Sequence, residues 1–215
     1  MKLIQIVWKQ SKWMLLAVLA LLAAGLLLIQ KGNSRTDLLL SGLGINAALT
    51  EEGTAWMTEE LSRALYAGDR EETAYVVTTM TPFSNEGAMN DNYYLLQYIV
   101  SLCRSDSLDY FILDKTAMEN LISQDLFLDL GQFFTAEERR NMEPELVYSV
   151  AAPEKGEEID LSAKRPVALE VSGLPFFKEN GPDGALYFAI SSRSTRVSAC
   201  RVLWEHILAW KNQAS

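Results

Sequence analysis

The sequence predicts an α/β fold, a mostly parallel sheet with helices on both faces, preceded by one N-terminal transmembrane helix. Short apolar runs alternate with amphipathic helical patterns, which is the order of a parallel sheet built from crossover units. The run from Tyr110 to Leu113 carries no charge, as expected of a strand buried on both faces. A separate run of 17 uncharged residues, Trp13 to Ile29, precedes the first acidic residue.

The N-terminal run is long enough to cross a bilayer when it is extended to Gln30. No small-x-small cleavage pattern follows it, which favours an uncleaved anchor, although a signal peptide stays open. Slightly more basic residues precede the run than follow it, which favours a cytoplasmic N-terminus. We therefore predict a single-pass cell-membrane protein with these parts: a cytoplasmic N-terminus (1–12), the transmembrane anchor (13–30), a linker (31–36), an extracytoplasmic domain (37–211) and a tail (212–215).

The charge of the predicted domain restricts its partners. All 28 acidic residues but only 14 of the 19 basic residues follow position 36, which gives this part a formal charge of −14. Nucleic-acid binding needs clustered Lys and Arg, so we expect no nucleic-acid partner. The 49% share of hydrophobic residues over 215 positions is enough for one well-buried domain.

The first half of the domain alternates between strands and helices. Asp37 to Leu40 predicts a strand, and the following Ser41 to Gly44 predicts a glycine-rich turn. Tyr93 to Cys103 is apolar nearly all round and predicts a largely buried helix. The remaining elements of this half are a helix (49–66), a strand (72–81) and a loop (82–92).

The second half begins with the central strand and two helix-start signals. Thr116 to Glu119 and Thr135 to Glu138 both have the form of a capping box. A charged segment (151–166) and a turn-rich segment (178–184) interrupt the later strands. The predicted elements are strands at 110–113, 146–150, 167–171 and 185–190, and a closing helix from Ser198 to Lys211 with an apolar stripe.

Several of these segments occur in an order of strands, turns and helices that is known from another protein family. They are the strand Asp109 to Asp114, the segments Met118 to Leu121 and Leu126 to Leu130, the strand Ala185 to Ile190, its polar turn Ser191 to Thr195, and the helix Ala199 to Trp210. This plan resembles the extracellular solute-binding proteins of ABC importers, which have the type 2 periplasmic-binding-protein fold. The resemblance covers most of residues 36–211 and implies one periplasmic-binding-protein-like lobe.

One departure from that family concerns the second lobe. Only about 50 residues lie between Phe134 and Ala185, whereas a second lobe needs about 100. The chain therefore looks like a truncated, single-lobe relative, and ligand capture between two closing lobes is in doubt.

Catalytic patterns are sparse, so we expect a non-catalytic protein with no cofactor and no bound metal. His206 is the single histidine and falls in the closing helix, where a structural role is expected. The sequence holds no HExxH, GxSxG, P-loop or GxGxxG pattern. Cys103 and Cys200 could form a disulfide, but their apolar surroundings favour two buried thiols. A hydrolase would need a facing pair of acids, and four aspartates are available: Asp109, Asp114, Asp125 and Asp129.

A ligand site in a wound sheet lies beyond the carboxyl ends of its parallel strands. The residues predicted at those ends are Ser41, Gly42, Thr81, Phe83, Ser84, Asp114 and Lys115. We expect a domain that binds a small solute or a neighbouring membrane or envelope protein. The alternative is a structural or assembly protein of the cell envelope that binds a protein partner and has lost ligand binding.

Overall fold

The structure is a computed structural model that describes residues 38–66, 75–81, 89–150 and 164–210. All of these residues belong to one compact unit. The predicted N-terminus, anchor, linker and tail lie outside the described residues, as do Phe83, Ser84 and most of the charged segment 151–166. No helix within the described ranges is both long and apolar enough to cross a bilayer.

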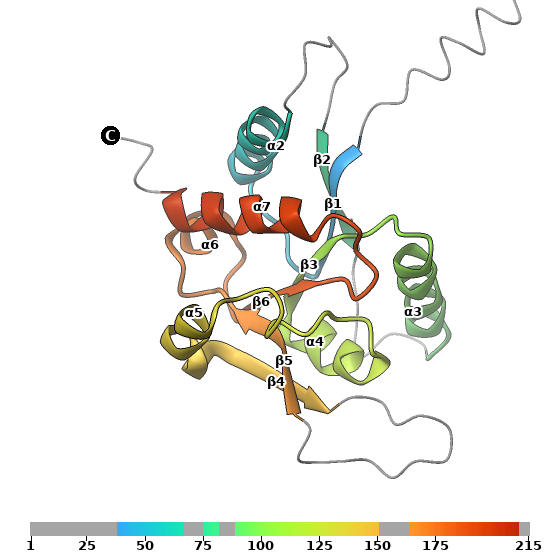
Figure 1. Cartoon of the computed structure of the whole chain (residues 1–215). Helices are drawn as coiled ribbons and strands as arrows, with labels where there is room; N and C mark the ends of the chain where they lie inside the picture. The colour runs from blue at the N-terminus through green and yellow to red at the C-terminus, as the bar shows by residue number, and fades with distance from the viewer. Residues whose placement is uncertain (1–37, 67–74, 82–88, 151–163, 211–215) are drawn as a thin grey trace, which may run out of the picture. The chain divides into compact units, whose positions relative to one another are not determined.

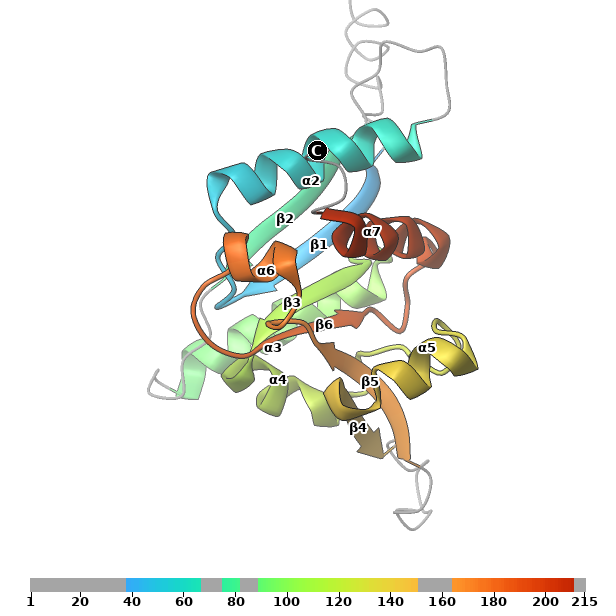
Figure 2. The same ribbon diagram turned by 90° about the vertical axis from the view of Figure 1, so that its left-hand side faces the viewer.

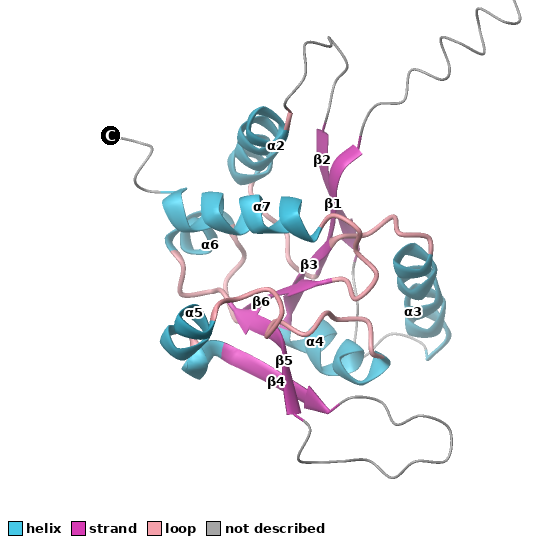
Figure 3. Cartoon of the chain, viewed as in Figure 1, coloured by secondary structure: helices cyan, strands magenta, loops and turns pink. Residues whose placement is uncertain are grey.

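Within these ranges six strands form one sheet, shown in Figures 1 and 3. Its strands are β1 (Leu38–Ile45), β2 (Tyr75–Thr81), β3 (Tyr110–Asp114), β4 (Leu146–Val150), β5 (Lys164–Glu170) and β6 (Leu186–Ile190). The spatial order is β2-β1-β3-β6-β5-β4. The β2-β1 and β1-β3 pairs are parallel, and the β3-β6, β6-β5 and β5-β4 pairs are antiparallel.

The α/β class is confirmed, but the sheet is mixed and not mostly parallel. Helical crossovers connect β1, β2 and β3, which keeps these strands parallel. β5 and β6 are joined by only 15 residues that contain one six-residue helix, and β6 returns antiparallel to β5. β6 then lies between β3 and β5. The burial of the central strand β3 was predictable from its residues, whereas the direction of each strand depends on these connections.

Helices lie on both faces of the sheet (Figures 1 and 2). The helices are α2 (Glu51–Leu65), α3 (Met89–Arg104), α4 (Lys115–Leu121), α5 (Ala136–Asn141), α6 (Pro175–Asn180) and α7 (Val197–Ala209), with the 3₁₀ turns η1 (Ile122–Gln124) and η2 (Glu143–Glu145). α2, α6 and α7 cover one face, and α3 and α4 cover the other. We call these the α7 face and the α3 face.

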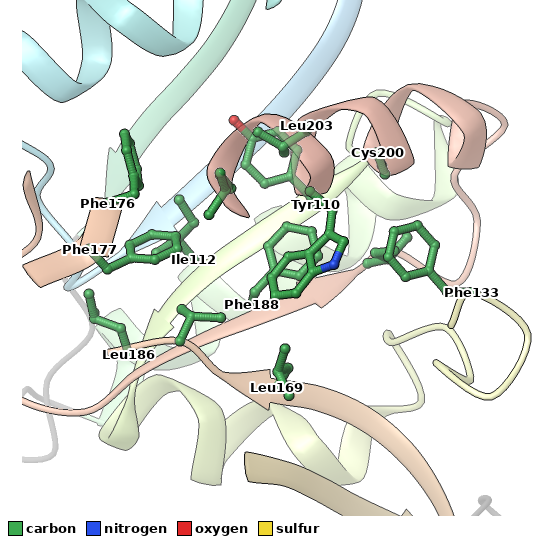
Figure 4. Packing of buried hydrophobic residues seen from close by; sticks show 14 of the residues in the cluster. Tyr110, Ile112, Phe133, Leu169, Phe176, Phe177, Leu186, Phe188, Cys200 and Leu203 are labelled. Carbon is green, nitrogen blue, oxygen red and sulfur yellow. The ribbon is translucent and has the colours of Figure 1, made fainter. Parts of the chain in front are cut away.

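Alternate residues of the central strands fill the two faces. On β3, Tyr110 and Ile112 point to the α7 face, and Phe111 and Leu113 to the α3 face. Phe188 of β6 joins the α7 face, where Figure 4 shows it with Tyr110 beneath α7. The prediction of a central strand buried on both faces is confirmed.

The predicted glycine turn from Ser41 to Gly44 is wrong, because these residues continue β1. Gly42 pairs directly with Tyr110 of β3. A Cβ atom at Gly42 would lie 2.1 Å from Tyr110 Cζ, so the buried tyrosine ring occupies the space that a side chain would need. Glycine here permits close contact inside a strand and does not mark a bend.

Three further local predictions are corrected. α3 is not buried all round, since Tyr93, Tyr94 and Tyr98 are 58%, 69% and 50% exposed. α4 begins two residues earlier than the Thr116 capping box implied, because Asp114 caps it and accepts a 2.7 Å hydrogen bond from the Ala117 amide. The helix α6, which starts with a proline at its first position, was not predicted, and its last three residues overlap the turn-rich segment expected at 178–184.

Candidate functional site

The predicted ligand edge at the carboxyl ends of β1, β2 and β3 is occupied by structural contacts. Asp114 Oδ1 caps α4, and its Oδ2 accepts a hydrogen bond of 3.2 Å from Asn46 Nδ2, just after β1. Lys115 is exposed, with its Nζ 3.9 Å from Glu119 Oε1. Thr81 ends β2 and pairs in register with Ile45. The Asp114 carboxylate therefore joins β1 to the start of α4.

Two other predicted ligand residues lie elsewhere. Ser41 and Gly42 sit inside β1 and not at its end. The Ser41 amide donates to Asp109 Oδ2 at 2.8 Å, and Gly42 is buried beneath Tyr110. The expectation that these two residues stand at the strand ends is wrong, because β1 runs on to Ile45.

A groove of about 410 Å³ lies on the α7 face beside the carboxyl end of β5. We call it the α7 groove. Leu169 of β5 and Trp204 of α7 are buried at its apolar wall, and Leu208 is 48% exposed beside them. Met142 and Leu174 complete the apolar lining. This volume falls within the range of about 300–1,000 Å³ that is usual for small-molecule sites.

The polar residues of the α7 groove are predominantly acidic. Glu145 ends η2, Glu170 ends β5, and both side chains are exposed. Neither carboxylate has a cationic partner among the described residues, although Ser172 Oγ donates to Glu170 Oε1 at 2.9 Å. Asn141 of α5 adds an amide. The groove thus combines an apolar wall with two negative charges that no cation of the described chain neutralises.

The two walls of the α7 groove are held together by a charged contact between α5 and α7. The predicted capping box of Thr135 and Glu138 is confirmed, and it starts α5. Arg201 of α7 forms a two-pronged ion pair with Glu138, in which Nη1 donates to Oε2 at 3.1 Å. The hydrogen bonds from Arg201 lower the pKa of Glu138 to about 2. This pair fixes α5, and hence Asn141 and Met142, against α7.

Both cysteines are buried and free. Cys200 lies beneath α7, and Cys103 lies on α3. Burial raises the pKa of Cys200 to about 12 and raises that of Cys103 as well. Each thiol is therefore uncharged at neutral pH and is a poor nucleophile there.

The four predicted aspartates do not come together as a pair across a cleft. Asp114 caps α4, Asp129 Oδ1 accepts from the Gly131 amide at 2.7 Å, and Asp125 pairs with Arg165. Asp109 is fully buried and bound to Arg196 at 3.1 Å. His206 lies half-buried on α7 against Trp56. Among the described residues, no group of three or more His, Cys, Asp or Glu is placed to hold a metal ion.

Sequence reasoning missed the α7 groove because its lining comes from α5, η2, β5, the loop after β5 and α7. No local motif connects those segments. Comparisons with protein-family models, curated proteins and solved structures found no match for this chain.

Proposed function

We propose that this chain is a non-catalytic binding protein that holds a small amphipathic cation in the α7 groove. An anchor at 13–30 would keep the domain on the outer side of the cell membrane, as the sequence predicts. The observation that carries the proposal is the apolar wall of Leu169 and Trp204 beside two carboxylates, Glu145 and Glu170, that lack a cationic partner. The resemblance to solute-binding proteins supports the same kind of function.

The chemistry of the groove favours a ligand with an apolar body and a positive end. An apolar group against Leu169, Leu174 and Leu208 would be removed from water, which contributes about 25 cal/mol per Å² of apolar surface. An ammonium group at the edge would meet Glu145 and Glu170. A carboxylate ligand would instead be repelled by both. The groove therefore distinguishes amines from acids by charge and from small polar solutes by its apolar wall.

Calorimetric titration of the full-length chain in a neutral detergent tests this function. Three probes share a phenyl ring: phenethylamine is cationic, 2-phenylethanol is neutral and 3-phenylpropionate is anionic. We expect phenethylamine alone to bind measurably. The double variant Glu145→Gln/Glu170→Gln should weaken that binding at least ten-fold, which corresponds to about 1.4 kcal/mol.

The matched control is Glu119→Gln, which removes an exposed acid on α4, on the opposite face of the sheet. It should leave phenethylamine binding unchanged. The proposal fails if phenethylamine binds no better than 2-phenylethanol. It also fails if the double variant binds phenethylamine as tightly as the unaltered chain does.

A second candidate function, assembly with an envelope protein, is favoured by the exposed tyrosines of α3. Tyr93, Tyr94 and Tyr98 all have at least half of their surface exposed, and residues 93–105 contain no acid. Tyrosine is enriched at protein interfaces. A photo-crosslinking residue at position 94 should give one defined adduct in cells, whereas the same residue at exposed position 119 should not. Equal labelling from both positions, or none from position 94, contradicts this function.

A further inference from the structure

A second cavity, of about 340 Å³, lies on the α3 face. We call it the α3 pocket. It opens between α3, the turn that follows η1 and the loop that follows β6. The Ser192 amide donates to the Leu126 carbonyl at 2.8 Å, and Ser192 Oγ donates to the Asp125 carbonyl at 3.2 Å. These bonds tie the loop to the turn and define one wall of the cavity.

The charges of the α3 pocket are opposite to those of the chain as a whole. Arg104, the last residue of α3, and Arg193, in the loop after β6, both line it. In the part of the chain that the structure describes, neither guanidinium has an acidic partner. The one acid in the lining, Asp125, is already paired with Arg165. The cavity therefore keeps an excess of positive charge within a chain of net charge −9.

The other groups in the α3 pocket do not cancel this charge. Cys103 lies in the lining, and burial raises the pKa of its thiol, so the sulfur carries no negative charge at neutral pH. Gln97 and Gln124 present side-chain amides, and Gln124 Nε2 makes only a 3.3 Å bond to its neighbour Ser123. The pocket thus offers two guanidinium groups and amide donors without a free carboxylate.

We propose that the α3 pocket is a binding site for a small oxyanion ligand, one that carries a carboxylate or a phosphate, held by Arg104 and Arg193. The planar guanidinium group binds either oxyanion through two parallel hydrogen bonds. Gln97 and Gln124 line the same pocket, and their side-chain amides are further hydrogen-bond donors. The volume suits a small molecule, and two arginines are too few for a nucleic-acid surface. This site is separate from the α7 groove and does not depend on the amine proposal.

The test is calorimetric titration of the full-length chain with glutarate, inorganic phosphate and the neutral analogue glutaramide, all at one ionic strength set with chloride. We expect glutarate, phosphate or both to bind, and glutaramide not to bind. Binding of glutarate alone identifies a carboxylate site, and binding of phosphate alone identifies a phosphate site. Arg104→Gln and Arg193→Gln should each weaken the bound anion at least ten-fold.

Arg140→Gln is the matched control, because Arg140 is an exposed residue of α5, outside the α3 pocket. It should not change anion binding. Circular dichroism and thermal unfolding check that each variant is folded. The proposal is overturned if neither anion binds. It is equally overturned if Arg104→Gln and Arg193→Gln weaken binding no more than Arg140→Gln, since the anion would then respond only to overall charge.

Discussion

The α7 face and the α3 face are built from the same strands but are filled differently. The α7 face holds many rings, among them Tyr110, Phe176, Phe188 and Trp204. Trp204 stacks on Phe188 at 5.7 Å between ring centroids and meets Phe134 edge-on at 5.4 Å. The buried rings of the α3 face are Phe111 and Phe127, and its other buried residues are smaller and mostly aliphatic. The aromatic core is therefore concentrated beneath α7.

The cavities on the two faces differ in their charge. The α7 groove has an apolar wall and two carboxylates without cationic partners in the described chain. The α3 pocket has two arginines without acidic partners there. Under the two proposals above, the two cavities would select ligands of opposite charge.

The largest expected effect is that of Trp204→Ala, which tests whether the α7 face is packed more tightly than the α3 face. Removing the indole from beneath α7 should lower the free energy of unfolding by about 3–5 kcal/mol, since both the buried surface and the ring contacts are lost. Ile99→Ala, on half-exposed α3, should cost about 2–3 kcal/mol. Urea denaturation of the full-length chain measures both values. Tyr94→Ala, at an exposed site, is the control and should stay within about 0.5 kcal/mol.

Equal losses in the free energy of unfolding for Trp204→Ala and Ile99→Ala would contradict the difference between the two faces. The α3 face would then be as tightly filled as the α7 face despite its exposed tyrosines. A cost for Trp204→Ala below that of Ile99→Ala would make α7 the loosely held helix.

The second prediction concerns Asp109, which joins β1 to the loop between β6 and α7 just before β3 begins. Its carboxylate accepts hydrogen bonds from the Ser41 amide and Ser194 Oγ, each at 2.8 Å, and from Arg196. Asp109→Ala should lower the free energy of unfolding by about 2–3 kcal/mol. The cost stays below that of a fully buried ion pair because Arg196 is partly exposed and can reach water. Urea denaturation measures the change, with exposed Asp183→Ala as the control.

Asp109→Ala should also affect ligand binding in the two cavities to different extents. Ser194 and Arg196 belong to the loop that carries Arg193 of the α3 pocket. Loss of Asp109 should therefore weaken anion binding more than it weakens amine binding in the α7 groove. An equal loss at both sites would show that the loop and α7 respond as one unit.

Much of the fold was predictable from local patterns. The Thr135 capping box is a signal contained in four consecutive residues, and the structure confirms it. The apolar stripe predicted for the closing helix was Cys200, Leu203, Ile207 and Trp210. The first three are buried, and Trp210, just after the end of α7, is half-buried against the same core. Burial on both faces of Tyr110 to Leu113 followed from the absence of any charged residue there. Each of these features depends on residues close together in the sequence.

The features that were missed depend on residues far apart. Gly42 is explained only by the ring of Tyr110, 68 positions later, which no local glycine pattern reveals. The antiparallel direction of β6 depends on the connection through α6. The α3 tyrosines were counted as apolar, although a phenol can remain at a wet surface through its hydroxyl group. The predicted ligand edge placed Asp114 correctly at the end of β3, but its capping role needed the position of α4.

The smallest expected effect tests the contact that holds α5 on α7 beside the groove. Glu138→Gln removes the charge that Arg201 binds but keeps the capping box, because a glutamine at this position can still accept from the Thr135 amide. At pH 7 we expect a loss of about 1 kcal/mol, since the pair is partly exposed and screened by water.

The direction in which this loss of stability changes with pH follows from the lowered pKa of Glu138. The pKa of Glu138 is about 2 in the folded chain and near its usual 4.5 when unfolded, so the charged form stabilises the fold above pH 4.5. That contribution fades as the pH falls from 4.5 towards 2, and the stability gap between the two proteins should close over the same interval. Urea denaturation at pH 7, 5, 4 and 3 measures it. A gap that stays constant down to pH 3 would mean that Arg201 does not bind the Glu138 carboxylate, and the wall of the α7 groove formed by α5 would need another support.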